Sequence, residues 1–181
     1  ISKSNVNGII ITGYGRHFSS GVEVDSLKEL VSSQTSFDNN GNIISYPARH
    51  KQDRKSFGFF HDLDIPVISA INGFCIGSGL ELALCSHIRI CGKGSIVGLP
   101  ESTFGFIPAL SGTLRCVELC GLGSAIELVL SGETFSVDEG LAIGIIDGSV
   151  KKKETLSYCE KLMKFILHKE APYQKEYINQ Y

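Results

Sequence analysis

No stretch of this 181-residue sequence stays apolar for the ~20 residues that a membrane-spanning helix needs. The first residues also lack a signal-peptide pattern, so we expect a cytoplasmic protein without a membrane partner. The 17 basic and 19 acidic residues nearly cancel, and the net charge of −2 gives no strong field to attract nucleic acid. The composition therefore argues against both membranes and nucleic acids as partners.

The sequence also lacks the residue spacings of common metal and disulfide sites. None of the six cysteines belongs to a C-x-x-C pair, and the five histidines show no H-x-x-x-H spacing. Most of the cysteines lie in apolar segments, which favours free, buried thiols in a reducing compartment over disulfides or zinc. We therefore expect no metal.

Motifs for nucleotide binding and for a serine nucleophile are incomplete. Gly13 and Gly15 follow a strand-like run, but Phe18 stands where a dinucleotide-binding turn has its third glycine. No P-loop is present, and Ser78 lies in a G-S-G run without the G-x-S-x-G spacing of a nucleophile elbow. These absences argue against nicotinamide-dependent, P-loop and serine-nucleophile chemistry.

The sequence does contain enough apolar material for one core, since 43% of its residues are hydrophobic. Strand-like and helix-like segments alternate along the chain, which predicts a single α/β fold with parallel strands. Strands are expected over 6–12, 67–71, 88–91 and 145–146. Helices are expected over 23–31, 48–63, 111–120, 124–131, 137–143 and 154–169, with a loop over 34–47 that contains a turn at 38–42.

The segment 64–115 holds the two carboxylates on which the functional hypothesis depends. After Asp64, only Glu81 and Glu101 carry a carboxylate within this mainly apolar stretch. An ionised carboxylate in apolar surroundings is costly unless it is paired, so its pKa should rise. Such a group suits proton transfer near neutral pH.

Each of these glutamates also has a structural interpretation. Ser78 and Glu81 fit the S-x-x-E capping box, in which the Glu81 carboxylate would accept a hydrogen bond from the Ser78 N–H. Glu101 follows a proline in an expected loop over 98–101, where a lone glutamate is usually solvated. The residue pattern alone leaves both alternatives open.

Several motifs, in order along the chain, resemble those of the crotonase superfamily of enoyl-CoA hydratases and isomerases. They are 18–24 (FSSGVEV), 65–73 (IPVISAING), 77–83 (GSGLELA), 99–101 (LPE), 104–108 (FGFIP), 112–113 (GT) and 130–136 (LSGETFS). The resemblance covers 11–147, which is most of the chain. It implies an α/β fold with a crotonase-like ββα spiral core, parallel strands and flanking helices.

The resemblance also implies a site for an acyl-CoA thioester. The backbone N–H groups of Val22 and Ser78 would form an oxyanion hole for the thioester oxygen and stabilise the enolate that forms. Arg16, Ser20 and Val22 would contact CoA, although an exposed loop arginine explains Arg16 equally well. CoA is part of the substrate, and no further cofactor is implied.

The two glutamates take their roles from the same resemblance. Glu81 and Glu101 are twenty positions apart, as in hydratases of the family, and would hold and activate the water that adds to Cβ. Glu101 would donate the proton to Cα. This role requires that Glu81 point into the cavity and not cap Ser78.

The leading hypothesis is an enoyl-CoA hydratase, a lyase of fatty acid metabolism that adds water across the 2,3 double bond of an enoyl thioester. Isomerase, dienoyl-CoA hydratase, thioester hydrolase or decarboxylase chemistry in the same site stays open, as does a carrier-protein thioester in place of CoA. A different class is a non-catalytic crotonase-fold binding protein, against which the carboxylate pair argues. The family also implies a homotrimer or a dimer of trimers.

The resemblance divides the chain into two parts. Residues 1–150 correspond to the crotonase-like core without its usual first strand and helix. Residues 151–181 correspond to a C-terminal helical segment that is shorter than in the family. Residues 29–63 form a longer stretch than usual and would build the wall over the acyl chain, so the sequence does not define the acyl group.

Overall fold

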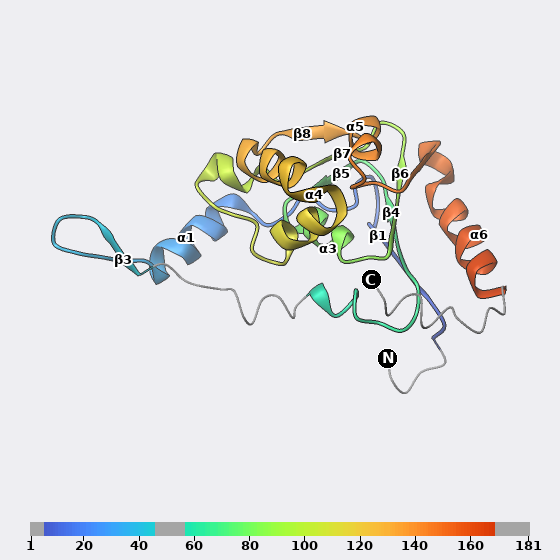
Figure 1. The fold of residues 1–181 in the computed structure, drawn as a ribbon, viewed down its shortest axis with the longest axis horizontal. Helices are drawn as coiled ribbons and strands as arrows, with labels where there is room; N and C mark the ends of the chain where they lie inside the picture. Colours follow the sequence, from blue (N-terminus) through green and yellow to red (C-terminus); the bar gives the residue numbers. More distant parts are fainter. Residues whose placement is uncertain (1–5, 46–56, 169–181) are drawn as a thin grey trace.

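The structure is a computed structural model that describes residues 6–45 and 57–168 (Figure 1). At its centre is a four-stranded parallel sheet in the order β1-β4-β6-β9. Its strands are β1 (Ile9–Thr12), β4 (Val67–Ile71), β6 (Ile88–Gly92) and β9 (Gly148–Val150). Every residue of β4 is buried, as expected for an apolar strand that is covered on both faces.

A second sheet of three short strands lies next to the first. It contains β5 (Phe74–Ile76), β7 (Ile96–Gly98) and β8 (Thr134–Ser136), with β5 parallel and β8 antiparallel to β7. β5 follows β4 after only two residues, and Gly73 provides the turn with a φ of 63°. β4 and β6 are therefore each followed by a strand of the second sheet, and the pair β4–β5 leads directly into a helix. This strand–strand–helix order produces a ββα spiral.

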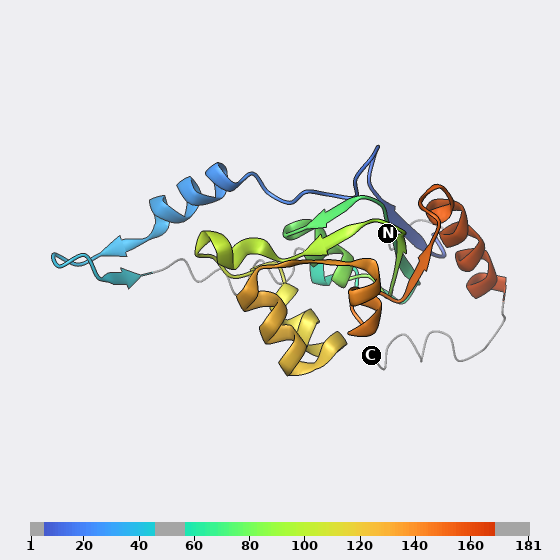
Figure 2. The same ribbon diagram turned by 90° about the horizontal axis from the view of Figure 1, so that it is seen from above.

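The helices are α1 (Val24–Gln34), α3 (Ser78–Leu84), α4 (Gly112–Ser131), α5 (Val137–Ala142), α6 (Thr155–His168) and the 3₁₀ helices η1 (Pro100–Phe104) and η2 (Lys152–Glu154). All the helices except α1 lie around the two sheets (Figure 2). α6 packs against the four-stranded sheet, while α4 packs against α3 and η1 on the other side (Figure 2). α1 leads away from the core to a hairpin of β2 (Ser36–Phe37) and β3 (Ile43–Ser45).

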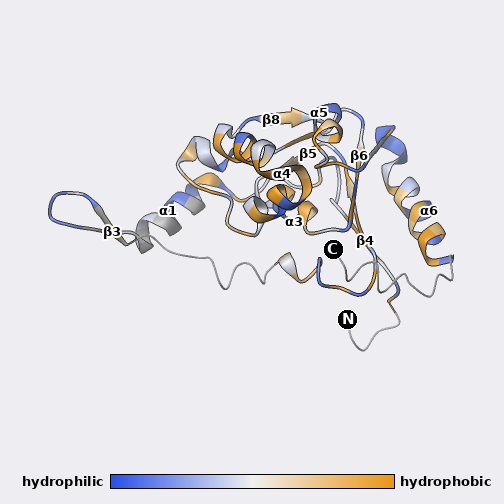
Figure 3. Cartoon of the chain, in the orientation of Figure 1, coloured by the Kyte–Doolittle hydropathy of each residue, from blue (hydrophilic) through white to orange (hydrophobic). Residues whose placement is uncertain are grey.

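Two apolar clusters fill the spaces between these layers. The smaller cluster lies between the four-stranded sheet and α6 and contains Ile68, Ala70, Ile90, Cys159 and Met163. Ile71 belongs to the larger cluster on the side of α3 and α4, because successive side chains of a strand point to opposite faces. Figure 3 shows that apolar residues predominate on β4 and α4, whereas the tip of the β2–β3 hairpin is hydrophilic.

Most of the elements expected from the sequence are confirmed. β1, β4 and β6 form three of the four expected strands, and α1, α5 and α6 match the helices over 23–31, 137–143 and 154–169. The two helices over 111–120 and 124–131 form the single element α4, which is interrupted at Gly121 by non-helical backbone angles (φ 77°, ψ 166°). No helix in the described ranges is both long and apolar enough to cross a bilayer.

Three expectations are corrected. Ile145 and Ile146 do not form a strand, because their N–H groups donate to the Gly140 carbonyl at 3.0 and 3.1 Å, and β9 begins only at Gly148. The loop over 34–47 contains the β2–β3 hairpin, whose turn is held by hydrogen bonds to Asp38. The loop over 98–101 is the end of β7 followed by η1. The expected helix over 48–63 lies largely outside the described residues.

Candidate active site

Glu81 lies in the middle of α3 and is only 2% exposed. Its Oε1 atom accepts hydrogen bonds from the N–H groups of Leu110 at 2.7 Å and Gly112 at 2.8 Å. The N-cap of α3 is Gly77, and no side chain caps this end of the helix. The capping-box interpretation of Glu81 is therefore wrong, because its carboxylate is bound to the segment that leads into α4.

Burial is the largest influence on the pKa of Glu81. Loss of solvent raises its pKa from 4.5 to about 7, although the hydrogen bond from Gly112 N–H acts in the opposite direction. This value already includes two smaller effects, since the nearby charge of Glu101 raises the pKa and the Leu110 N–H lowers it. Glu81 can therefore exist in both protonation states near neutral pH, which suits a group that exchanges protons.

Glu101 lies in η1, one residue after Pro100 starts this short helix. The side chain is half-buried, and its Oε2 atom is enclosed without a hydrogen-bond partner among the described residues. Burial raises the pKa of this carboxyl group as well. Its environment therefore differs from the solvated loop that the alternative interpretation assumed, and it favours the protonated form.

The two carboxylates are close enough to interact electrostatically, and each lies next to a glycine. A Cβ atom on Gly112 would lie 2.7 Å from Glu81 Oε1, and one on Gly77 would lie 3.0 Å from Glu101 Oε1. The Cys116 thiol, which is fully buried, interacts electrostatically with both carboxylates. A side chain at either position would displace the nearby carboxylate, and at Gly77 the φ of 57° also favours glycine.

The two expected oxyanion donors lie on adjacent segments of this site. The loop before Val22 runs beside β5, where Ile76 N–H donates to the Ser19 carbonyl at 3.0 Å. A Cβ atom on Gly77 would lie 3.9 Å from the Cα atom of Gly21, so the residues that follow these glycines are neighbours.

The N–H groups of these neighbours are available to a ligand. Ser78 is the first residue of α3, and its N–H has no acceptor within the helix. Within the part of the chain that the structure describes, neither the Val22 N–H nor the Ser78 N–H donates to a protein group. Both donors also lie near Gly77, which contacts Glu101.

The residues expected to contact CoA lie at the surface. Arg16 and Ser20 are both exposed, and they flank Phe18, which is buried. The ring of His17 stacks on Phe74 with a centroid separation of 4.6 Å. Ser20 is close to the oxyanion loop in the chain, and contact of either residue with CoA stays a prediction.

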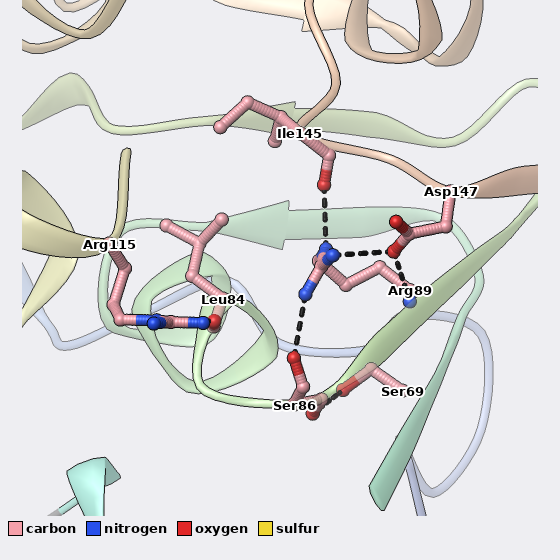
Figure 4. A network of polar contacts seen from close by, with 7 residues as sticks. All are labelled: Ser69, Leu84, Ser86, Arg89, Arg115, Ile145 and Asp147. Carbon is pink, nitrogen blue, oxygen red and sulfur yellow. Dashed lines mark hydrogen bonds and ion pairs between the residues drawn. The ribbon is translucent and has the colours of Figure 1, made fainter. Parts of the chain in front are cut away.

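The sequence did not indicate which groups hold Glu81 and its helix. The Leu110 and Gly112 N–H groups carry no side-chain signal, and only the glycine itself hints at a close approach. Arg115 donates from Nε to the carbonyl of Leu84, the last residue of α3, at 3.1 Å (Figure 4). It also forms an ion pair with Glu118.

A second buried arginine lies close to the same end of α3. Arg89 of β6 donates to the carbonyls of Ser86 and Ile145 and pairs with Asp147 at 2.6 Å (Figure 4). Nothing about the spacing of these residues in the sequence points to this contact. It joins the end of α3 to the segment that precedes β9.

The described residues contain no cluster of three or more His, Cys, Asp and Glu side chains that could hold a metal ion. All six cysteines are free. The site therefore offers two carboxylates of raised pKa and two unpaired backbone N–H groups. This arrangement can move protons beside a carbonyl oxygen that gains negative charge.

Comparison with known proteins identifies the family. A model of the enoyl-CoA hydratase/isomerase family matches residues 1–176. The chain is 34% identical over 158 residues to a probable enoyl-CoA hydratase of Bacillus subtilis, covering 87% of this chain and 57% of that protein. It is 30% identical over 173 residues to the peroxisomal fatty acid beta-oxidation multifunctional protein of Arabidopsis thaliana, covering 96% of this chain and 23% of that protein.

A solved structure gives the same result. The structure of a putative enoyl-CoA hydratase from Thermobifida fusca in complex with CoA superimposes with a TM-score of 0.76 at 26% identity, covering 96% of this chain and 66% of that one. The chain thus spans about half the length of the Bacillus relative and about two thirds of this structure. It has the crotonase fold. Together, these matches show that the chain belongs to the enoyl-CoA hydratase/isomerase family.

Proposed function

We propose that this chain is an enoyl-CoA hydratase, a lyase that adds water across the 2,3 double bond of an enoyl thioester. The observation that carries the proposal is the pair Glu81 and Glu101, two carboxylates of raised pKa that lie beside two unpaired backbone N–H groups. Hydration needs one group that takes a proton from water and one that gives a proton to Cα. A carboxylate pair can supply both.

The environments of the two glutamates suggest how the roles divide. Burial raises the pKa of Glu81 to about 7, so its ionised form is populated near neutral pH, and the two backbone N–H bonds to Oε1 stabilise that form. Glu101 Oε2 is enclosed without a partner, which favours its neutral form. Glu81 is then the base that accepts a proton as the water oxygen bonds to Cβ, and Glu101 is the acid that protonates Cα. Proton exchange with a second water restores both groups.

The thioester oxygen gains negative charge when water adds to Cβ and loses it when Cα is protonated. The N–H groups of Val22 and Ser78 would stabilise this enolate oxygen. Arg16, Ser20 and Val22 would contact the CoA part of the substrate, and the CoA complex of the Thermobifida protein supports CoA as the thiol carrier. The reaction as proposed uses no further cofactor.

Substrate, assembly and location follow from the relatives only as proposals. The name of the Arabidopsis protein supports an enoyl thioester of fatty acid beta-oxidation as the substrate. A homotrimer or a dimer of trimers is proposed, and the exposed apolar residues Leu122, Ile126 and Leu130 on α4 provide a surface for subunit contact. A cytoplasmic location stays a prediction.

The test follows enoyl-CoA consumption by the loss of absorbance of the enoyl-thioester band. A panel of short, long, branched and cyclic enoyl-CoAs should contain a substrate that is hydrated. Glu81→Gln and Glu101→Gln should each lower turnover at least about a hundredfold. Glu127→Gln is the matched control, because Glu127 is an exposed glutamate on the outer part of α4.

The products distinguish the alternatives. Migration of the double bond without hydration would indicate an isomerase, and release of free CoA would indicate a hydrolase. Binding of acyl-CoA without any turnover would favour a non-catalytic binding protein. Wild-type turnover in both glutamine variants would remove the assignment of the carboxylates.

A further inference from the structure

Two polar contacts, one helical turn apart, join α3 to α4. In the first, Glu81 Oε1 on α3 accepts from the N–H of Gly112 at 2.8 Å. In the second, the Leu84 carbonyl on α3 accepts from Nε of Arg115 at 3.1 Å. Each member of the second contact follows its counterpart in the first by three residues, so both contacts lie on one face of each helix. Together they fix the register of α3 against α4.

The Arg115 side chain is held in place on several sides. It is 8% exposed, and its Nη1 atom forms an ion pair with Glu118. The same atom lies 3.4 Å from His61 Nε2. His61 is connected to His87, whose Nε2 atom lies 3.2 Å from the His61 carbonyl and whose Nδ1 atom accepts from the Val67 N–H at the start of β4. The guanidinium therefore has a defined orientation relative to the central sheet.

We propose that Arg115 is a positioning residue, which holds the end of α3 through the Leu84 carbonyl and thereby places Glu81 opposite Glu101. The planar guanidinium donates in a fixed direction, which a lysine amine cannot reproduce. Without this contact, the C-terminal end of α3 loses a polar contact to α4, and the position of Glu81 then depends on its own hydrogen bonds and on apolar packing. A displacement of about 1 Å in a reacting group can cost a hundredfold in rate.

A purely structural role is the competing explanation. A cation at the C-terminal end of a helix satisfies carbonyl groups that have no intrahelical donor, and this alone would stabilise the fold. The two explanations differ in what happens to Glu81. Positioning predicts a change in the protonation and turnover of Glu81, whereas a structural role predicts only lower stability.

The experiment is Arg115→Lys, which keeps the positive charge and removes the planar donor. The pKa of Glu81, followed by carbon NMR of its carboxyl group, should rise because the bonds from the Leu110 and Gly112 N–H groups lengthen. Glu101, whose charge raises the Glu81 pKa, is unchanged in the variant, and burial raises the pKa of the nearby Cys85 and Cys116 thiols to about 11 and about 12, above the range of this titration. The kcat of hydration should fall by about tenfold or more, with KM changed less than about twofold.

Thr155→Val is the control, because Thr155 is also buried and polar, but its hydroxyl donates to Asn72 Oδ1 at 2.9 Å and to the Lys152 carbonyl at 3.1 Å, away from α3 and α4. It should lower the melting temperature while the Glu81 pKa and kcat stay within about twofold of wild type. An unchanged Glu81 pKa in Arg115→Lys, or the same change in both variants, would overturn the inference.

This inference rests on the proposed function for its kinetic part only. If the wild-type protein hydrates no enoyl-CoA, the proposed hydratase activity is wrong, and the NMR titration still decides whether Arg115 positions Glu81. If hydration occurs and the titration is unaffected by Arg115→Lys, the hydratase proposal stands and the positioning role falls.

Discussion

Glu81→Gln should stabilise the protein above neutral pH although it removes activity. The glutamine side chain keeps an oxygen that can accept the Leu110 and Gly112 N–H groups, so the contact with α4 is preserved. What the substitution removes is a buried negative charge. Burial raises the pKa of Glu81 from 4.5 to about 7, so ionisation of this group costs the folded state free energy.

The direction in which stability changes with pH follows from the proton affinity of Glu81 in the folded and unfolded states. Glu81 holds its proton more tightly in the folded protein than in the unfolded chain, so its contribution to stability is complete below pH 4.5. This contribution is lost as the pH rises through the folded-state pKa of about 7. A shift of this size corresponds to about 3 kcal/mol between the two limits. The glutamine variant does not titrate and should keep this free energy.

The assay is urea denaturation of both proteins from about pH 5 to about pH 8. The free energy of unfolding of the variant, relative to wild type, should increase across this range by about 2.5 kcal/mol, because part of the full change falls below pH 5. A difference that is independent of pH, or that declines as the pH rises, would refute the reasoning, because it would mean that the folded state does not disfavour the Glu81 charge.

Three further predictions concern the same site and one helix end. Glu101→Gln should lower the pKa of Glu81, since Glu101 raises this pKa when it is ionised, and NMR titration of the Glu81 carboxyl measures the change. Gly77→Ala should cost about 1–3 kcal/mol in urea denaturation and reduce kcat, because φ is 57° and a Cβ atom would lie 3.0 Å from Glu101 Oε1. Ser136→Ala removes the capping box with Glu139 and should cost about 1 kcal/mol of unfolding free energy, with activity unchanged.

Two apolar patterns were predictable from the sequence. The run Val67–Ile71 forms β4, because a short, β-branched apolar run is typical of a strand buried on both faces. The amphipathic segment over 154–169 forms α6, because its helical spacing places the apolar side chains on one face. The three-residue strands of the second sheet were not predicted, since such short segments carry no period. Ile145 and Ile146 were wrongly predicted as a strand. They are buried, but burial alone does not distinguish a strand from a turn that packs against α5.

The candidate site, like the fold, was only partly predictable from the sequence. The sequence by itself identified Glu81 and Glu101 as the carboxylates in an apolar stretch, and it gave Val22 and Ser78 through the order of family motifs. It left open whether Glu81 caps its own helix, because a carboxylate can accept from a local N–H group or from N–H groups that are distant in the sequence. Only the packing of α3 against α4 decided this, by placing the Leu110 and Gly112 N–H groups within hydrogen-bonding distance of Glu81.

The apolar sequence around Glu81 predicted the direction of its pKa shift, but tertiary structure alone decided the extent of that shift and the contacts of Arg115. Both depend on groups about thirty residues away in the chain, which no local pattern encodes. Residue type and order thus determined which elements form and which groups can transfer protons. The three-dimensional packing determined how far those groups are desolvated and where they point, because desolvation and direction depend on neighbours that are distant in the sequence.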